Sequence, residues 1–346
     1  MNLSGLLPLL NNNPAYRALL DELKAHHRGE RGLPLIRAAR PYLLAALAGS
    51  LRKPLVVVTG KVETAGAVVD ALRAYTGDPS CVLRFPEPPV LLYERAPWPR
   101  EVVCERLAVL ATLANPPALP PIIVASVRAL MQRTLPPRSF RANLRTLKKG
   151  QNIGVGKALL AWIAMGYERA TVVEAPGQFS ARGGILDVFP PASPYPIRIE
   201  LFGEEIESLR KFDPGLQRSQ DALSEAVITP ASEAMARHGQ QAVEHIGKWD
   251  TRHLPEDIAA SLKRDLASLQ SGDPFTGIEF YLPYFYSEPA SLLNYLEEDG
   301  LVAVDEPGEA ADVWTELEEQ AVELRDQAGE AGTLPPNYPL PYITWD

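Results

Sequence analysis

Hydrophobic positions in the first part of the chain follow two alternating periods. Residues 54–59 form a β-branched run bounded by Pro54 and Gly60, which is typical of a strand buried on both faces of a parallel sheet. Apolar residues recur at helical spacing on either side of this run. Strands that alternate with helices predict a parallel sheet covered by helices. The helices expected here span residues 14–23, 65–75 and 100–114, and the further strands span 81–85 and 122–126.

The pattern changes after residue 135. In residues 197–202, three apolar residues alternate with Arg198 and Glu200, as in a half-buried antiparallel strand. Gly203-Glu204 follows where a tight hairpin would turn, and a second strand is expected over residues 205–212. This stretch therefore predicts a small α+β domain. Its other expected elements are a helix over 157–165 and strands over 171–174 and 185–189.

Helix and strand alternation returns beyond residue 222. Strand-like residues 227–230 and 301–307, with a helix over 257–269, suggest a return to the first sheet. The Pro-rich end, residues 333–346, is typical of a linker. We therefore predict an α/β domain in two parts, residues 1–135 and 223–346, the latter with the linker tail. A small α+β domain, residues 136–222, is inserted between them.

Composition limits the class of protein. Hydrophobic residues make up 46% of the 346 residues and charged residues 22%, which is the balance of a globular chain. No apolar run approaches the roughly 20 residues that span a bilayer, and no secretory signal is recognisable at the N-terminus. Only two cysteines, Cys81 and Cys104, are present. Because secreted proteins favour disulfides, this usage predicts a cytoplasmic protein without a membrane partner.

The charge disfavours a nucleic-acid grip as the main function. The net charge is -9, from 43 acidic and 34 basic residues, whereas domains that bind a phosphate backbone usually carry a dense basic face. A small local DNA contact is not excluded by this balance. The densest basic cluster comprises Arg138, Arg141, Arg145, Lys148 and Lys149.

The turn after the first buried strand resembles a nucleotide-binding P-loop only in part. That motif needs G-x-x-x-x-G-K-[ST], in which glycine N–H groups surround the phosphates and the hydroxyl holds magnesium. Here Lys61 follows Gly60, but Leu55 stands where the first glycine belongs and Val62 replaces the hydroxyl. We therefore predict no ATPase site and no cofactor in this chain. Asp305-Glu306 ends a later strand, as a metal-holding acidic pair would, but without a P-loop there is no bound phosphate for such a metal to contact.

Other catalytic and metal-binding patterns are missing from the sequence. The five histidines are irregularly spaced, and no C-x-x-C, H-E-x-x-H or G-x-S-x-G motif occurs. Acidic clusters at residues 204–207 and 297–299 are typical of solvated surface. We therefore expect no catalytic residue and no metal site.

Residues 166–191 are the strongest candidate for a binding surface. Arg182 precedes Gly183-Gly184, where the backbone can approach another surface closely, and Arg169 lies thirteen positions earlier at the head of an expected strand. Phe179 and Phe189 flank Arg182. Arginine and aromatic residues dominate protein–protein hot spots. The alternative is that both rings are core and that the arginines pair with Glu168 or Glu174.

The same residues carry a resemblance to a known family. Residues 166–191 and 197–219, with ASVRALMQR, TPASE and GIEFYLPYFYSEPASLLNYL elsewhere, resemble the N-terminal region of the bacterial transcription–repair coupling factors (Mfd). They are also similar to the excision-repair protein UvrB. The resemblance implies a RecA-like α/β domain lacking a P-loop, with an inserted α+β domain that recruits UvrA. It further implies that the full-length protein is a translocase using ATP and magnesium, which acts on DNA and RNA polymerase.

The resemblance also assigns residues to the expected interface. The UvrA-contacting arginines of UvrB match Arg169 and Arg182, with Phe189 as an apolar companion, and we expect both arginines on one face of the sheet. The sequence departs from UvrB at Ser180, where UvrB has a further arginine, so one contact of that interface is in doubt. Two alternatives stay open: a UvrB-like ATPase, against which the broken P-loop counts, and a direct DNA-binding domain.

Overall fold

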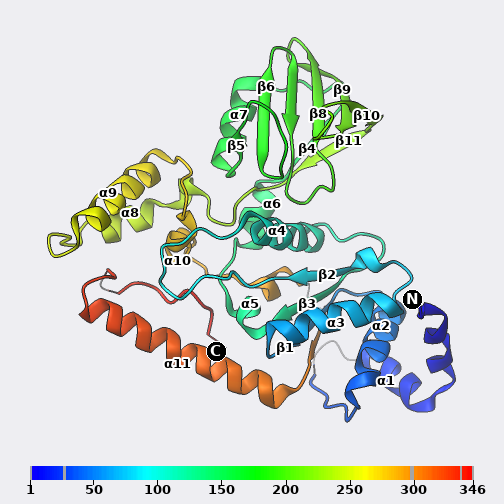
Figure 1. Cartoon of the computed structure of the whole chain (residues 1–346). Helices are drawn as coiled ribbons and strands as arrows, with labels where there is room; N and C mark the ends of the chain where they lie inside the picture. The colour runs from blue at the N-terminus through cyan, green and yellow to red at the C-terminus, as the bar shows by residue number, and fades with distance from the viewer. Residues whose placement is uncertain (1, 26–28, 297–299, 336, 345–346) are drawn as a thin grey trace. The chain divides into compact units, whose positions relative to one another are not determined.

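The computed structural model describes residues 2–25, 29–296, 300–335 and 337–344. The chain folds into two compact units, each assembled from stretches far apart in sequence (Figure 1). The boundaries expected at residues 135 and 222 stay predictions. Unit 1 comprises Met1–Glu87, Thr112–Gln132 and Leu292–Leu317, and unit 2 comprises Pro88–Ala111, Arg133–Ser291 and Glu318–Asp346.

Unit 1 contains a parallel four-stranded sheet in the order β12-β1-β3-β2. All five residues of β1 (Leu55–Thr59) and of β3 (Ile122–Ser126) are buried; burial was predicted for β1 from its β-branched run, and for β3 only a strand was predicted. The outer strands are β2 (Val82–Phe85) and β12 (Leu301–Val304). The pairing of β12 with β1 confirms that the chain returns to its first sheet near residue 301, and the predicted parallel α/β fold is confirmed.

Helices α2 and α3 supply apolar side chains to the core on one face of this sheet, where Ala48, Val69 and Leu72 pack against Val57 and Val124. The helices of unit 1 are η1 (Ser4–Asn12), α1 (Pro14–Ala25), η2 (Arg37–Ala39), α2 (Arg40–Leu51), α3 (Val62–Tyr75), η3 (Pro79–Cys81), α5 (Val127–Met131), η6 (Leu292–Tyr295) and the beginning of α11 (Pro307–Glu330).

Unit 2 contains a six-stranded sheet in the order β10-β9-β8-β7-β6-β5, antiparallel except for the β5–β6 pair. Helix α7 (Val155–Ala164) packs on one face (Figure 1), where Trp162 joins a core with Phe179 and Ile199. The strands are β5 (Glu168–Arg169), β6 (Gln178–Arg182), β7 (Ile185–Val188), β8 (Ile197–Phe202), β9 (Glu205–Phe212) and β10 (Ser219–Ala222). A separate ribbon joins β4 (Arg145–Lys148) to β11 (Glu225–Ile228).

Two predicted strands differ from the structure. Residues 171–174 are not a strand, because the N–H groups of Glu174 and Ala175 donate to the Gln178 side chain instead of a ladder. Val173 is nevertheless fully buried, so the apolar pattern indicated a buried segment but not its secondary structure. Residues 227–228 belong to β11, which pairs with β4 rather than with the first sheet.

The rest of unit 2 consists of helices joined by irregular segments, and a buried ion pair lies in its core. Arg106 donates two hydrogen bonds to Glu233, at 2.6 and 3.0 Å, and both side chains are almost fully buried. The tail expected to be a linker instead contributes buried Tyr338 and Tyr342. The helices are α4 (Arg100–Ala114), α6 (Pro137–Ala142), η4 (Ala236–His238), α8 (Gln240–Ile246), α9 (Glu256–Ser271), η5 (Ile278–Tyr281), α10 (Leu282–Phe285) and the end of α11.

Candidate partner-docking face

The β6–β7 hairpin positions the predicted arginine Arg182. Its turn needs glycine for two local reasons: Gly183 has φ +58°, and a Cβ on Gly184 would lie 3.0 Å from the carbonyl oxygen of Leu201 on β8. Only glycine adopts that φ without steric cost. The close approach that we expected at these glycines is therefore made to the neighbouring strand within the sheet.

Asp187 is the centre of the sheet face opposite the α7 core. It pairs with Ser180 on β6 and with Arg198 on β8, and its carboxylate is fully buried. Arg198 donates to both carboxylate oxygens, at 2.8 and 2.9 Å, and Arg182 Nη2 donates to Oδ2 at 3.2 Å. We call this group, Arg182, Asp187 and Arg198, the arginine–aspartate cluster.

The arginine–aspartate cluster holds more positive than negative charge. Arg198 is 12% exposed, its guanidinium lies 4.8 Å from the centre of the Phe212 ring, and hydrogen bonding to Asp187 raises the Arg198 pKa. The side chain of Arg182 is 52% exposed. A guanidinium carries five N–H donors in a fixed fork, and Arg182 uses one on Asp187. Asp187 therefore holds Arg182 at the surface while about half of its side chain stays exposed.

Arg169 does not share a sheet face with Arg182, which corrects our expectation. Arg169 pairs with Phe179, whose ring is in the α7 core, and Arg182 lies three residues beyond Phe179 on β6. Because side chains alternate between faces along a strand, the side chains of Arg169 and Arg182 leave the sheet on opposite faces. Arg169 is exposed on β5, the edge strand of this sheet. A partner reaching both would have to wrap around that edge.

The two aromatic residues that flank Arg182 are packing residues in the structure. Phe179 is 1% exposed and makes an edge contact with Trp162, 5.6 Å between ring centres. Phe189 is 9% exposed and forms a small cluster with Val173 and Phe212. The burial of Phe189 leaves little of its ring for a partner, so its role in binding stays a prediction.

Sequence reasoning missed Asp187 and Arg198. Both belong to predicted strands, and alternation alone places them on the polar face of each strand. Their contact depends on the register, which pairs Asp187 with Arg198 and which a single sequence does not specify. The sequence did contain one signal for this contact: an acidic and a basic residue stand at polar positions of two successive strands.

In unit 1, the turn that resembles a P-loop is occupied by the chain's own carboxylate. A Cβ on Gly60 would lie 2.9 Å from Glu309 Cγ, and the Glu309 carboxylate pairs with Lys61 Nζ at 3.4 Å. Thr59 Oγ1 donates to the Lys61 carbonyl oxygen at 2.9 Å. A negative group beside the N-terminus of α3 takes the position that favours anions. Lys61 is thus paired with Glu309, and the Glu309 side chain packs closely against Gly60.

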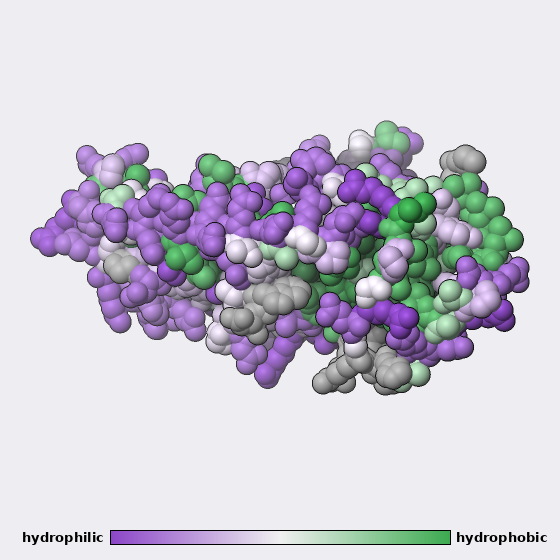
Figure 2. Space-filling model, turned by 90° about the horizontal axis from the view of Figure 1, so that it is seen from below, coloured by the Kyte–Doolittle hydropathy of each residue, from purple (hydrophilic) through white to green (hydrophobic). Residues whose placement is uncertain are grey.

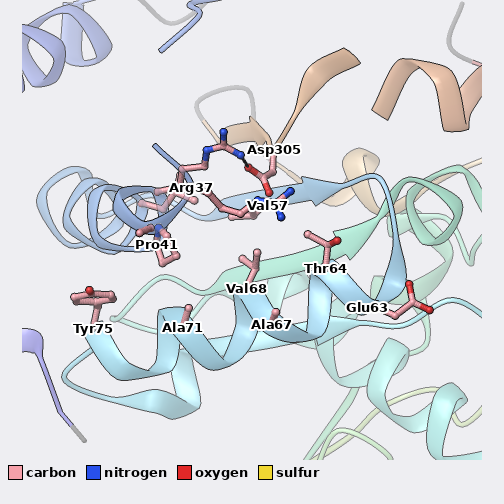
Figure 3. A pocket seen from close by; sticks show the side chains of 13 residues that line it. Arg37, Pro41, Val57, Glu63, Thr64, Ala67, Val68, Ala71, Tyr75 and Asp305 are labelled. Atoms are coloured by element: carbon pink, nitrogen blue, oxygen red, sulfur yellow. Dashed lines mark hydrogen bonds and ion pairs between the residues drawn. The ribbon is translucent and has the colours of Figure 1, made fainter. Parts of the chain in front are cut away.

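Unit 1 also contains a cavity of about 510 Å³ between α2, α3 and β1 (Figure 3). Its lining is mostly apolar, including Val57, Val68 and Tyr75. Arg40 donates to Asp305 at 2.5 Å and pairs with Glu306 at 2.8 Å. The charge of Arg40 is therefore balanced inside the chain, and the cavity offers chiefly apolar surface.

Exposed apolar side chains gather near the N-terminal end of unit 1, as Figure 2 shows. Leu9 of η1 is 60% exposed and Ile36 is 77% exposed.

Within the described ranges, no group of three or more His, Cys, Asp or Glu side chains could hold a metal ion. Within the same ranges, no helix combines the length and apolar character needed to cross a membrane.

Comparison with known proteins assigns the six-stranded sheet to a described domain family. Residues 146–233 match the family model described as the UvrB interaction domain. That range contains β5 to β11 and the whole arginine–aspartate cluster. The cluster therefore lies within the matched residues of this chain.

Full-length relatives cover most of the chain. It is 34% identical to the transcription-repair-coupling factor of Myxococcus xanthus over 90% of this chain and 27% of the relative. It is 31% identical to the factor of Bacillus subtilis strain 168, over 86% of this chain and 26% of the relative. The factor of Haemophilus influenzae is 31% identical over 71% of this chain and 21% of the relative. The chain thus spans about a quarter of the length of the curated relatives it matches.

Proposed function

Because this chain is a homologue of the transcription-repair-coupling factors and contains a UvrB interaction domain, we propose that it is the part of such a factor that docks UvrA. The observation that carries the proposal is the arginine–aspartate cluster inside that domain. A buried carboxylate fixes Arg182 while leaving its side chain half exposed. A fixed, exposed guanidinium suits a protein interface, because little side-chain entropy is lost on binding.

The docking role is non-catalytic. The Glu309 carboxylate beside Lys61 and Gly60 supports this, because a phosphate placed there would meet a like charge. Val62 also supplies no hydroxyl for magnesium. ATP and magnesium, and the partners DNA and RNA polymerase, belong in this proposal to the rest of the longer protein. Calorimetry with Mg-ATP should give no binding heat with this chain, and tight binding lost in Lys61→Ala would favour the UvrB-like ATPase.

The direct test of docking is calorimetric titration of purified UvrA into the whole chain. We expect one saturable binding event that persists at 0.15 M salt, where long-range attraction is screened beyond about 8 Å. A parallel titration with duplex DNA separates the rival function. Steeply salt-dependent DNA binding together with no UvrA binding would replace docking by nucleic-acid binding.

A further inference from the structure

Phe202 is the most exposed of the large hydrophobic side chains identified among the described residues, at 81%. It ends β8 at the tip of the β8–β9 hairpin, where Gly203 turns the chain with φ +64°. A phenylalanine gains by leaving water, and aromatic anchors at interfaces are typically seated in a pocket of the partner. Within the described part of unit 2 this ring stays largely in water, so burial in a partner's pocket would stabilise it.

Phe202 belongs to the same sheet face as Arg182. Arg182 pairs with Ile185, and Ile185 pairs with Glu200, so these three side chains form a row across β6, β7 and β8. Phe202 lies two residues beyond Glu200 on β8. The register shift between Glu200 and Leu201 places its extra residue, Glu207, on β9, so alternation along β8 is kept and Phe202 points to the same side as Glu200. Leu201, between them, packs against the core on the other face. Ile185 is 37% exposed, which adds apolar area between Arg182 and Phe202.

The charges on this face define the partner chemistry. The arginine–aspartate cluster supplies the positive side, with Arg182 exposed. At the hairpin tip, the exposed Glu205 pairs with Phe202 across the turn and adds a negative side. A complementary surface therefore needs an apolar pocket with an acidic group on one side and a basic group on the other.

We propose that Phe202 is the apolar anchor of the docking face and enters a pocket of UvrA that is flanked by an acidic group opposite Arg182. This proposal rests on the docking function proposed above. The exposed guanidinium of Arg182 and its continuity with Phe202 select the face, and the exposed ring selects the residue. Phe202 then determines affinity chiefly through the dissociation rate, as buried interface groups generally do.

The experiment measures UvrA binding by the whole chain, with Phe202→Ala, Arg182→Ala and the control Leu160→Ala. Leu160 is 69% exposed on α7, so it loses comparable apolar surface away from the docking face. Phe202→Ala should weaken binding by about tenfold or more, with an unchanged melting temperature and wild-type binding by Leu160→Ala. Wild-type affinity in Phe202→Ala, with binding lost in Arg182→Ala, would overturn the anchor and leave docking intact.

Two further outcomes complete the test. If the wild-type chain does not bind UvrA, the docking function itself is wrong and the anchor falls with it. If Phe202→Ala melts at a lower temperature than the wild type, crosslinking decides. A photoreactive phenylalanine analogue at position 202 should crosslink to UvrA, whereas the same analogue at position 160 should not. Absence of a crosslink from position 202 in a bound complex contradicts the anchor.

Discussion

The Asp187 carboxylate is fully buried, yet it binds two guanidinium groups on the outer face of the sheet. Removing one partner of a buried ion pair leaves an uncompensated charge, which typically costs about 3–5 kcal/mol. Asp187→Asn keeps the size of the side chain and removes its charge. We expect it to lower the free energy of unfolding by about 3 kcal/mol, the low end, because Arg198 keeps some exposure to water.

Urea unfolding of the whole chain measures this loss. Glu225→Gln is the control, because Glu225 is half exposed and pairs with exposed Lys148, where a salt bridge contributes about 0–1 kcal/mol. Equal stability of Asp187→Asn and the control would show that the cluster does not hold the hairpin face together.

Glu279 in η5 gives a residue-scale prediction on pH. Burial raises its pKa to about 7, and the nearby Glu233 adds to the effect; Glu279 Oε2 is buried with no hydrogen-bond partner in the described part of the chain. The unfolded chain ionises this group near pH 4.5, whereas the folded chain stays protonated to about pH 7. Stability should therefore fall as pH rises from about 4.5 to about 7, by on the order of 2–3 kcal/mol.

Glu279→Gln tests the pH effect because it stays neutral throughout. Its unfolding free energy should lack this fall and should exceed that of the wild type at pH 8. Parallel pH profiles of wild type and Glu279→Gln, measured by urea unfolding, would contradict a buried, protonated Glu279.

Hairpins were the elements most accurately predicted from sequence. β8 and β9 have the predicted bounds, because strict alternation and a Gly-Glu turn are local signals. Residues 171–174 were predicted as a strand from their β-branched pattern, but that pattern also fits a buried loop. The hydrogen bonds that backbone N–H groups donate to the Gln178 side chain, which favour the loop, are not visible in the pattern. The pairing of β11 with β4 depends on contacts about 80 residues apart in sequence, which local patterns do not encode.

Gly166 lies where α7 leads into β5. It has φ +91°, and a Cβ there would lie 2.6 Å from Ser232 Cβ. Gly166→Ala adds both backbone strain and a steric overlap, so we expect a loss of at least about 2 kcal/mol of unfolding free energy.

Gly150→Ala is the matched control for Gly166→Ala. Gly150 has φ +82° but open space around the missing Cβ, so only the backbone strain of about 1–2 kcal/mol applies. Thermal melting of the two variants separates strain from overlap. A smaller loss in Gly166→Ala than in Gly150→Ala would contradict the close contact with Ser232.

For the whole molecule, the parallel α/β sheet and a separate small sheet domain were predictable, because the hydrophobic period changes along the chain. The candidate site was predictable in part. Arg182 was identified from its residue type and neighbours, and its placement by Asp187 needed the register. The burial of the tail residues Tyr338 and Tyr342 could not be predicted. A Pro-rich composition indicates a linker, and it gives no information on whether the aromatic residues of that segment pack into a core.

At the level of the whole molecule, the chain is proposed to act as a docking module for UvrA. The most direct measurement is the affinity of UvrA for the chain carrying Arg182→Ala, beside the control Arg252→Ala, whose side chain is 90% exposed outside the six-stranded sheet. Truncating one partner of a desolvated charge pair typically costs about 2–5 kcal/mol. We predict a loss of about 30-fold or more for Arg182→Ala, in a chain whose melting curve shows it folded at the assay temperature, and wild-type affinity for Arg252→Ala. Wild-type affinity in Arg182→Ala would contradict the account.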